Sequence, residues 1–431
     1  MNGYSESQSA DSSGPARPNP LANARQIELE RRAVRIWSSS NVQRAKDELR
    51  ELFLTRNQAR LPAGAATLQP ALEEMAFAFL LRTLNSDPHH PEILWDQNVP
   101  HSWFGIDVPG SRCTGHNPDN IYRRIPIATN VRYELSGRRW EPEAAETTFS
   151  LLPDVSVQHS WSPIAVDGRS IATEPDGSFL LTLDADPPKS RANHIQLLPG
   201  TKRMTIRESM LDWEEENPYS LSIRVVGITS TEAPENDTEI AERVATRLKS
   251  FVAHWLEFID GSYYSTPPNA LPMAGATGGG LATQISAMGN YSLGEDEVLV
   301  LNVDRLDAQY SSLEVLSPWM FCTEYRKRTG SLNHFQAVPD SDQRYTFVIA
   351  LHDPGVHNWL DTNGLGQGCM QMRWQGLPPL PPSRIGDAIR LRRVRLADLP
   401  MVLPNDTKML NEVERRHALQ VRAEAHDRRF F

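Results

Sequence analysis

The N-terminal part of the chain shows apolar residues at helical spacing. Ile27, Ala33 and Ile36 recur among Glu and Arg residues, and the apolar face continues through Leu49 and Phe53. This spacing predicts a helix over residues 22–55. A second pattern predicts a helix from about residue 65 to residue 84, where Asn-Ser-Asp-Pro ends it. Together the two helices predict a helical cap over residues 21–86.

The pattern changes near Pro100 to alternating apolar and polar positions. Residues 122–137 alternate through Ile125, Ile127, Tyr133 and Leu135, as expected of strands buried on one face. Pro, Gly and Asp turn signals separate further short runs of this kind. These runs lie at 147–152, 178–183, 194–198, 204–208 and 220–226, and again at 298–303, 310–315, 345–351 and 370–374. We therefore predict two β units, residues 87–235 and 271–395.

Helical spacing returns between the two β units and at the end of the chain. A continuous apolar stripe from Ile240 to Ile259 predicts an amphipathic helix that links the units over residues 236–270. Residues 389–396 are predicted to begin a helical end, and residues 396–431 are predicted to contain a charged C-terminal helix. The predicted fold class is mainly β with accessory helices (α+β), built from antiparallel β-sandwich or open-barrel units. No internal repeat is evident in the sequence.

Composition narrows the possible fold classes and binding partners further. The 32 prolines and 25 glycines among 431 residues argue against an all-helical fold. A net charge of −10 argues against a nucleic-acid partner, and no apolar run approaches the roughly 20 residues of a membrane span. The three cysteines are far apart, which excludes a disulfide framework. Residues 1–20 are predicted to be a disordered leader, and the protein is predicted to be cytoplasmic with no membrane partner.

The segment from His352 to Trp374 concentrates polar side chains at a turn between two late strands. A His beside a carboxylate suits general acid–base chemistry, and an Arg suits binding of an oxyanion. The predicted catalytic residues are therefore His357, Asp361 and Arg373, with Asn358 and Trp359 binding the substrate. The alternative is a structural corner, in which Asp361 and Asn358 cap turns, Trp359 fills the core and Arg373 pairs with Asp361.

Two other segments contain candidate residues. Residues 115–123 form a turn that enters a strand, and there Tyr122 and Arg123 are predicted to support substrate binding together with Trp319. Residues 207–216 contain several carboxylates, which would suit glycoside hydrolysis. An ion pair between Arg207 and Asp212 at a sheet edge is the alternative for that segment.

Cofactor motifs are missing from the sequence. It has no HExxH pair, no phosphate-binding loop and no Gly-x-Ser-x-Gly elbow, so no organic cofactor is predicted. A divalent metal held by His352 and His357, with Asp353 or Asp361, is kept as an alternative.

Several segments resemble one known family. The bacterial family called domain of unknown function 1214 resembles this chain in several segments of its second half. These segments are Gly294–Val300, Pro318-Trp319, Ser331–Asn333, His352–Thr362 and the closing Met372-Arg-Trp374. Pieces upstream, 117–122, 133–137 and 207–213, resemble it too, so the resemblance covers roughly residues 115–376. It implies a β-rich protein, often encoded near genes for catabolism of hydrophobic or aromatic compounds. Relatives have a His where this chain has Leu365.

Three functional hypotheses follow. The first is an enzyme that acts on a small, largely hydrophobic molecule (aromatic, terpenoid or steroid-like) by acid–base chemistry, as a hydrolase, lyase or isomerase, in a β-sandwich cavity. The second is a non-catalytic protein that binds a small ligand or a carbohydrate. The third is an assembly protein whose terminal helices mediate formation of a homo-oligomer.

Overall fold

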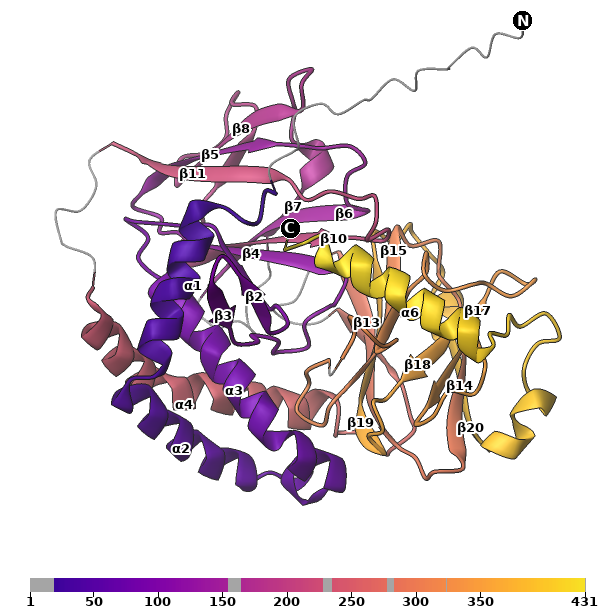
Figure 1. Ribbon diagram of the computed structural model, residues 1–431. Helices are drawn as coiled ribbons and strands as arrows, with labels where there is room; N and C mark the ends of the chain where they lie inside the picture. Colours follow the sequence, from indigo (N-terminus) through magenta and orange to yellow (C-terminus); the bar gives the residue numbers. More distant parts are fainter. Residues whose placement is uncertain (1–18, 154–163, 228–234, 277–282, 323, 431) are drawn as a thin grey trace, which may run out of the picture.

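The computed structural model describes residues 19–153, 164–227, 235–276, 283–322 and 324–430. Figure 1 shows two β-sandwiches side by side, with α-helices packed along both. The predicted fold class, mainly β with accessory helices, is confirmed. Most of the predicted leader, residues 1–20, lies outside the described residues.

The first sandwich follows the N-terminal helices. Its larger sheet has the strand order β1 (Leu94–Asp96), β4 (Asn120–Pro126), β10 (Arg203–Ser209), β6 (Glu146–Leu152) and β7 (Ile164–Asp167). Its smaller sheet has the order β11 (Ser220–Val226), β5 (Arg132–Arg138), β8 (Ser178–Asp184) and β9 (His194–Gln196). The inward side chains of both sheets form one apolar core, which includes Ile125, Leu135, Phe149 and Ile206. A hairpin of β2 (His101–Trp103) and β3 (Ile106–Val108) precedes β4.

The second sandwich occupies the C-terminal half. Its larger sheet has the order β12 (Met273–Ala276), β13 (Gln284–Ser292), β19 (Gln367–Gln375), β15 (Tyr310–Leu316) and β16 (Ser331–Asn333). Its smaller sheet has the order β18 (Trp359–Asp361), β17 (Tyr345–Ala350), β14 (Glu297–Val303) and β20 (Ile389–Arg395). Its core includes Leu301, Leu313, Met372 and the fully buried Trp374.

The two sandwiches have the same topology. The strands of the second unit, β12 through β20, correspond in chain order to β1 and β4 through β11 of the first. With this correspondence the two larger sheets have the same strand order, and so do the two smaller sheets. In both units one pair of strands in the smaller sheet is parallel, β8 with β9 and β17 with β18, whereas the other ladders are antiparallel. The chain therefore contains a structural duplication that its sequence does not reveal.

Helices join and cover the two units. They are α1 (Ala24–Trp37), α2 (Ser40–Leu54), α3 (Pro62–Leu84), α4 (Asp237–Ser262), α5 (Pro382–Gly386) and α6 (Glu412–Asp427), with short 3₁₀ segments at Asn57–Arg60, Gly168–Ser170 and Leu396–Met401. The single helix predicted over 22–55 is two helices, because the side chain of Ser39 accepts a hydrogen bond from the N–H of Val42 and starts α2 anew. No helix in the described ranges has the length and apolar character to cross a membrane.

The last helix connects the two units. In Figure 1, α6 (yellow) runs along the second sandwich toward β4 and β10 of the first. Near its start, Arg415 pairs with Asp353 at 2.9 Å. Just beyond its end, Arg429 donates to the carbonyl of Pro118 at 2.9 Å. The chain end thus fastens one sandwich to the other.

The prediction that residues 389–396 begin a helix is wrong. Residues Ile389–Arg395 form β20, which pairs with β14 over its whole length. Ile389, Leu391 and Val394 are partly buried, while the arginines between them lie at the surface. A run of arginines is compatible with a helix surface, but here pairing with β14 determines the structure.

Two neighbouring leucines on β8 test which side of this strand faces the apolar core of the first sandwich. Leu181 is 1% exposed and Leu180 is 48% exposed, so they face opposite sides of the sheet. We expect Leu181→Ala to lower the free energy of unfolding by about 2–5 kcal/mol, because it leaves a cavity in the core. Leu180→Ala should change it by less than about 0.5 kcal/mol. Urea unfolding of both variants checks this, and equal losses would contradict the assigned faces.

Candidate functional site

A cavity of about 910 Å³ lies where the helices meet both sandwiches. Its walls come from α3, α4, the outer face of β4 and β10, and the outer face of β13 and β19. It is therefore outside the apolar core of either sandwich. Its lining residues come from both sandwiches and from two helices, between Phe79 and Arg373, which makes it the leading candidate for a functional site.

One wall is the outer face of the first larger sheet. Because side chains alternate along a strand, Tyr122 and Arg124 of β4 lie on one face and line the cavity, whereas Ile125, which also touches the cavity, packs in the core. On β10, Arg203 and Arg207 lie on the cavity side. Tyr122 is opposite Arg207 in the β4–β10 ladder. The ladder thus places an aromatic ring and several cations on one surface.

A single face of α4 forms the opposite wall. Its lining residues recur at intervals of three and four, which is the period of one helix face. They are Arg243, Thr246, Arg247, Ser250, Phe251, His254, Trp255 and Phe258. The first half of this face is polar or basic and the second half is mainly aromatic. The cavity is consequently amphipathic along the axis of α4.

The second sandwich supplies the third wall, centred on Arg373 of β19. Arg373 is 3% exposed, and its guanidinium donates to the carbonyl of Gly115 at 2.7 Å and to Gln371 at 2.9 Å. It also pairs with Glu314 of β15 at 2.5 Å. Burial raises the pKa of Glu314 to about 7, although Arg373 opposes the shift.

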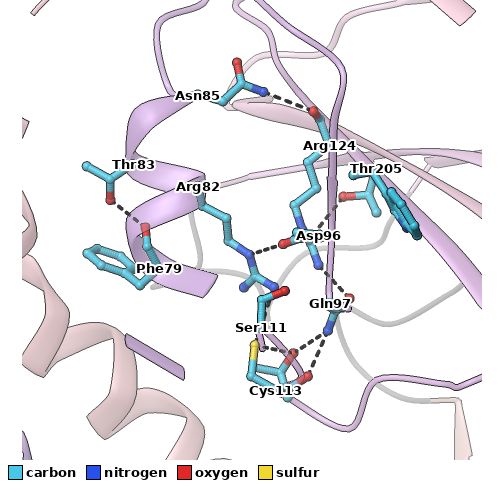
Figure 2. A network of polar contacts seen from close by, with 12 residues as sticks. Phe79, Arg82, Thr83, Asn85, Asp96, Gln97, Ser111, Cys113, Arg124 and Thr205 are labelled. Carbon is cyan, nitrogen blue, oxygen red and sulfur yellow. Dashed lines mark hydrogen bonds and ion pairs between the residues drawn. The ribbon is translucent and has the colours of Figure 1, made fainter. Parts of the chain in front are cut away.

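Figure 2 shows a charged network in which two arginines share one carboxylate, and both arginines line the cavity. Asp96 accepts hydrogen bonds from Arg82 of α3 at 2.7 Å and from Arg124 of β4 at 2.8 Å. Burial alone raises the pKa of Asp96, but Arg124 and Arg82 outweigh it and hold this pKa below its ordinary value. Gln97 accepts from Arg124 at 3.0 Å and donates to the carbonyl of Cys113 at 2.8 Å. The network fixes both guanidinium groups.

Two of the residues predicted from the sequence line the cavity, namely Tyr122 and Arg373. Arg123 points the other way, into the first sandwich, where it pairs with Glu208 and donates to the carbonyl of Tyr219. Trp319 is fully buried against Phe53, and its indole N–H donates to the carbonyl of Gly64 at 2.8 Å. These two side chains have structural contacts away from the cavity.

The remaining predicted residues lie around β18, which contributes nothing to the cavity lining. Asp361 pairs with Arg328 at 2.8 Å, so the predicted alternative pairing of Arg373 with Asp361 is wrong. Asn358 donates to the carbonyl of Val338 at 2.7 Å, and the Trp359 indole donates to that of Ala350 at 3.1 Å.

His357 lies beside Asn358, with 3.1 Å between Nδ1 and Oδ1. Burial lowers the pKa of His357, which favours a neutral imidazole. His352 is exposed and bonds to Glu295 at 2.8 Å. Among the described residues, no group of three or more His, Cys, Asp or Glu side chains is placed to hold a metal ion.

Sequence reasoning missed Arg124, Arg207 and the cavity face of α4. The interpretation of Arg207 as the partner of Asp212 is wrong, because the described contacts of Arg207 are with Ser150 and Tyr122, and Asp212 accepts from the backbone N–H of Glu214. The apolar stripe predicted from Ile240 to Ile259 does face the core. A second stripe from Arg243 to Phe258 follows the same period, and its aromatic half was the signal available in the sequence.

No family model and no curated protein matches this chain. Among solved structures it is similar to an uncharacterized protein from Burkholderia cenocepacia, with 24% identity, 85% of this chain and 99% of that chain covered, and a TM-score of 0.68. A protein from Vibrio parahaemolyticus matches at 9% identity over 65% of this chain and 90% of that chain, with a TM-score of 0.38, which is too low to support an argument. The first similarity shows the fold alone. The family resemblance stays a prediction.

The raised pKa of Glu314 predicts a specific pH dependence of stability. The folded protein retains a proton that the unfolded chain releases near its ordinary pKa of 4.5. Stability should therefore fall as the pH rises from about 4.5 to about 7, by up to about 3 kcal/mol relative to Glu314→Gln. Urea unfolding across this range measures the difference. The exposed substitution Glu214→Gln is the control, and parallel profiles for wild type and Glu314→Gln would contradict the shift.

Proposed function

We propose that the protein binds a small, largely apolar molecule in the cavity between α4 and the two sandwiches. The observation that carries this proposal is the aromatic half of the α4 face, which lines a space of about 910 Å³. Such a volume suits a molecule the size of an aromatic or terpenoid compound. The aromatic half of α4 includes Phe251 and Phe258. Phe79 of α3 and Met288 of β13 add further apolar surface to this part of the cavity.

Polar groups are few and fixed in this part of the cavity. The Tyr263 hydroxyl donates to Gln371 at 2.5 Å, and Gln371 accepts from Arg373 as well. A ligand with an apolar body and a few polar atoms would meet both kinds of surface here. Binding without catalysis is the function that this geometry supports best.

Acid–base chemistry on the bound molecule is the second candidate, in line with the predicted hydrolase, lyase or isomerase. The observation in its favour is Glu314, whose pKa of about 7 suits proton transfer near neutral pH. Glu314 is not itself a lining residue, but it pairs with Arg373, which lines the cavity. The predicted pair His357 and Asp361 lies outside the lining residues.

A neutral aromatic probe tests the proposed binding. Phenylnaphthylamine becomes fluorescent in apolar surroundings, and we expect it to bind the wild type at a single site. Trp255→Ala should weaken this binding about tenfold, because the indole supplies part of the apolar wall. His357→Ala is the control and should bind as the wild type does. Equal affinities for wild type and Trp255→Ala would place the probe elsewhere and overturn the proposal.

A further inference from the structure

We propose that the molecule bound in the cavity is an organic anion whose oxyanion head lies against Arg207 and Arg124. This inference rests on the proposed binding function and specifies the class of ligand. The head would be a carboxylate, or a phosphate or sulfate ester, on an apolar and preferably aromatic body. Guanidinium groups bind both kinds of oxyanion through paired hydrogen bonds.

The charge of the cavity lining supports the proposal. The basic side chains that line it come from α3, β4, β10, α4, β19 and the turn before β10, and they are Arg82, Arg124, Lys202, Arg203, Arg207, Arg243, Arg247 and Arg373. None of the described residues that line the cavity is an aspartate or a glutamate. The protein as a whole carries a net charge of −10, so this concentration of cations is local.

Carboxylates behind the lining neutralise only part of this charge. Glu314 pairs with Arg373, and Glu235 pairs with Arg243. Arg82 and Arg124 share the single carboxylate of Asp96, so this trio keeps a net positive charge. Their side chains are only 17% and 15% exposed, which limits screening by water.

Arg207 is a cation of this lining with little compensation. Its described contacts are a long hydrogen bond to the Ser150 hydroxyl at 3.4 Å and the ring of Tyr122, whose centroid is 6.0 Å away. No carboxylate in the described ranges lies within ion-pair distance of it. Glu146 is the acidic residue that acts on it electrostatically, but Glu146 accepts its hydrogen bond from Thr283 at 2.6 Å. Most N–H groups of the Arg207 guanidinium thus have no described partner within the protein.

Arg207 and Arg124 lie together on the cavity face of the β4–β10 ladder. In this ladder Arg207 is opposite Tyr122 and Arg124 is opposite Thr205, so the two arginines are diagonal neighbours. Burial lowers the pKa of Arg207, and the positive charge of Arg124 lowers it further. Both groups remain charged because a guanidinium does not lose its proton at neutral pH. Two adjacent cations held without equal countercharge are destabilising, and an oxyanion placed between them would relieve that cost.

The aromatic half of the α4 face supplies the complementary part of the site. An apolar body packed on Trp255 and Phe258 would occupy that half. The charged end of the same molecule would then contact Arg124 and Arg207 on the wall formed by β4 and β10. The cavity therefore matches an amphipathic acid better than a neutral hydrocarbon.

Matched probes separate the two proposals. Anilinonaphthalene sulfonate is phenylnaphthylamine with one added sulfonate, so the pair differs only in the anionic group. We expect the wild type to bind the sulfonate at least tenfold more tightly than the neutral probe. Naphthaleneacetate and naphthyl phosphate should both displace the neutral probe, and naphthaleneacetamide should do so at least tenfold more weakly. The tighter of the two anions identifies the head group as carboxylate or phosphate.

The variant Arg207→Met tests whether Arg207 causes the preference for the sulfonate over the neutral probe. It should reduce the affinity for the sulfonate at least tenfold and leave binding of the neutral probe within about twofold. Without ligand, the variant should melt at a higher temperature than the wild type, because an uncompensated cation is replaced by an apolar side chain. Arg132→Met, at an exposed site on β5, removes the same charge from the surface and should leave the preference for the sulfonate unchanged.

Three outcomes would overturn the inference. The first is equal affinity of the wild type for the sulfonate and the neutral probe, which refutes the anionic head while leaving apolar binding intact. The second is a preference for the sulfonate that persists in Arg207→Met. The third is a lower melting temperature of Arg207→Met, which would indicate that Arg207 is a structural partner of Glu146. If neither probe binds the wild type, the proposed binding function fails as well.

Discussion

The relative position of the two sandwiches depends on a buried carboxylate, Asp119, at their interface. Asp119 accepts hydrogen bonds from the Trp213 indole at 2.8 Å, the Tyr310 hydroxyl at 2.5 Å and the Asn333 amide at 2.9 Å. Tyr310 and Asn333 belong to the second sandwich, whereas Asp119 precedes β4 of the first. A buried carboxylate needs such donors, so the interface has little freedom to shift. The cavity inherits this constraint, because two of its walls are the sheets that Asp119 holds together.

The duplicated topology explains why a cavity forms where it does. Each sandwich keeps its apolar core inside and presents the outer face of its larger sheet to the helices. Those outer faces contain polar side chains, such as Arg207 in the first unit and Arg373 in the second. α4, the helix that links the units, bridges them with a face that is polar at one end and aromatic at the other. Neither sandwich alone contains the site.

The sequence predicted the fold better than the site, because alternation is local and a cavity is not. The pattern at 122–137 was sufficient to predict strands, whereas residues 389–396 required knowledge of the partner β14. The density of polar groups from His352 to Trp374 suggested chemistry, yet Asp361 and Asn358 bond within their surroundings. Arg207 resembled half of an ion pair until the structure showed which carboxylates surround it. Charge balance in three dimensions decides such cases, and spacing along the chain does not record it.

The duplication also leaves the molecule with two equivalent sheet edges, β11 and β20, which differ in their charged residues. Edge strands expose unpaired backbone groups that can recruit another chain. Four of the seven residues of β20 are arginines, and three of them pair with Asp387, Glu297 and Asp398. Another strand could pair with this edge only by displacing these long charged side chains and their partners. β11 carries a single arginine, Arg224, whose charge is matched by Glu134 on the neighbouring strand. The arginine run that misled the secondary-structure prediction therefore has a physical effect: it lines this edge of the second unit with charged side chains, which disfavours pairing with another strand.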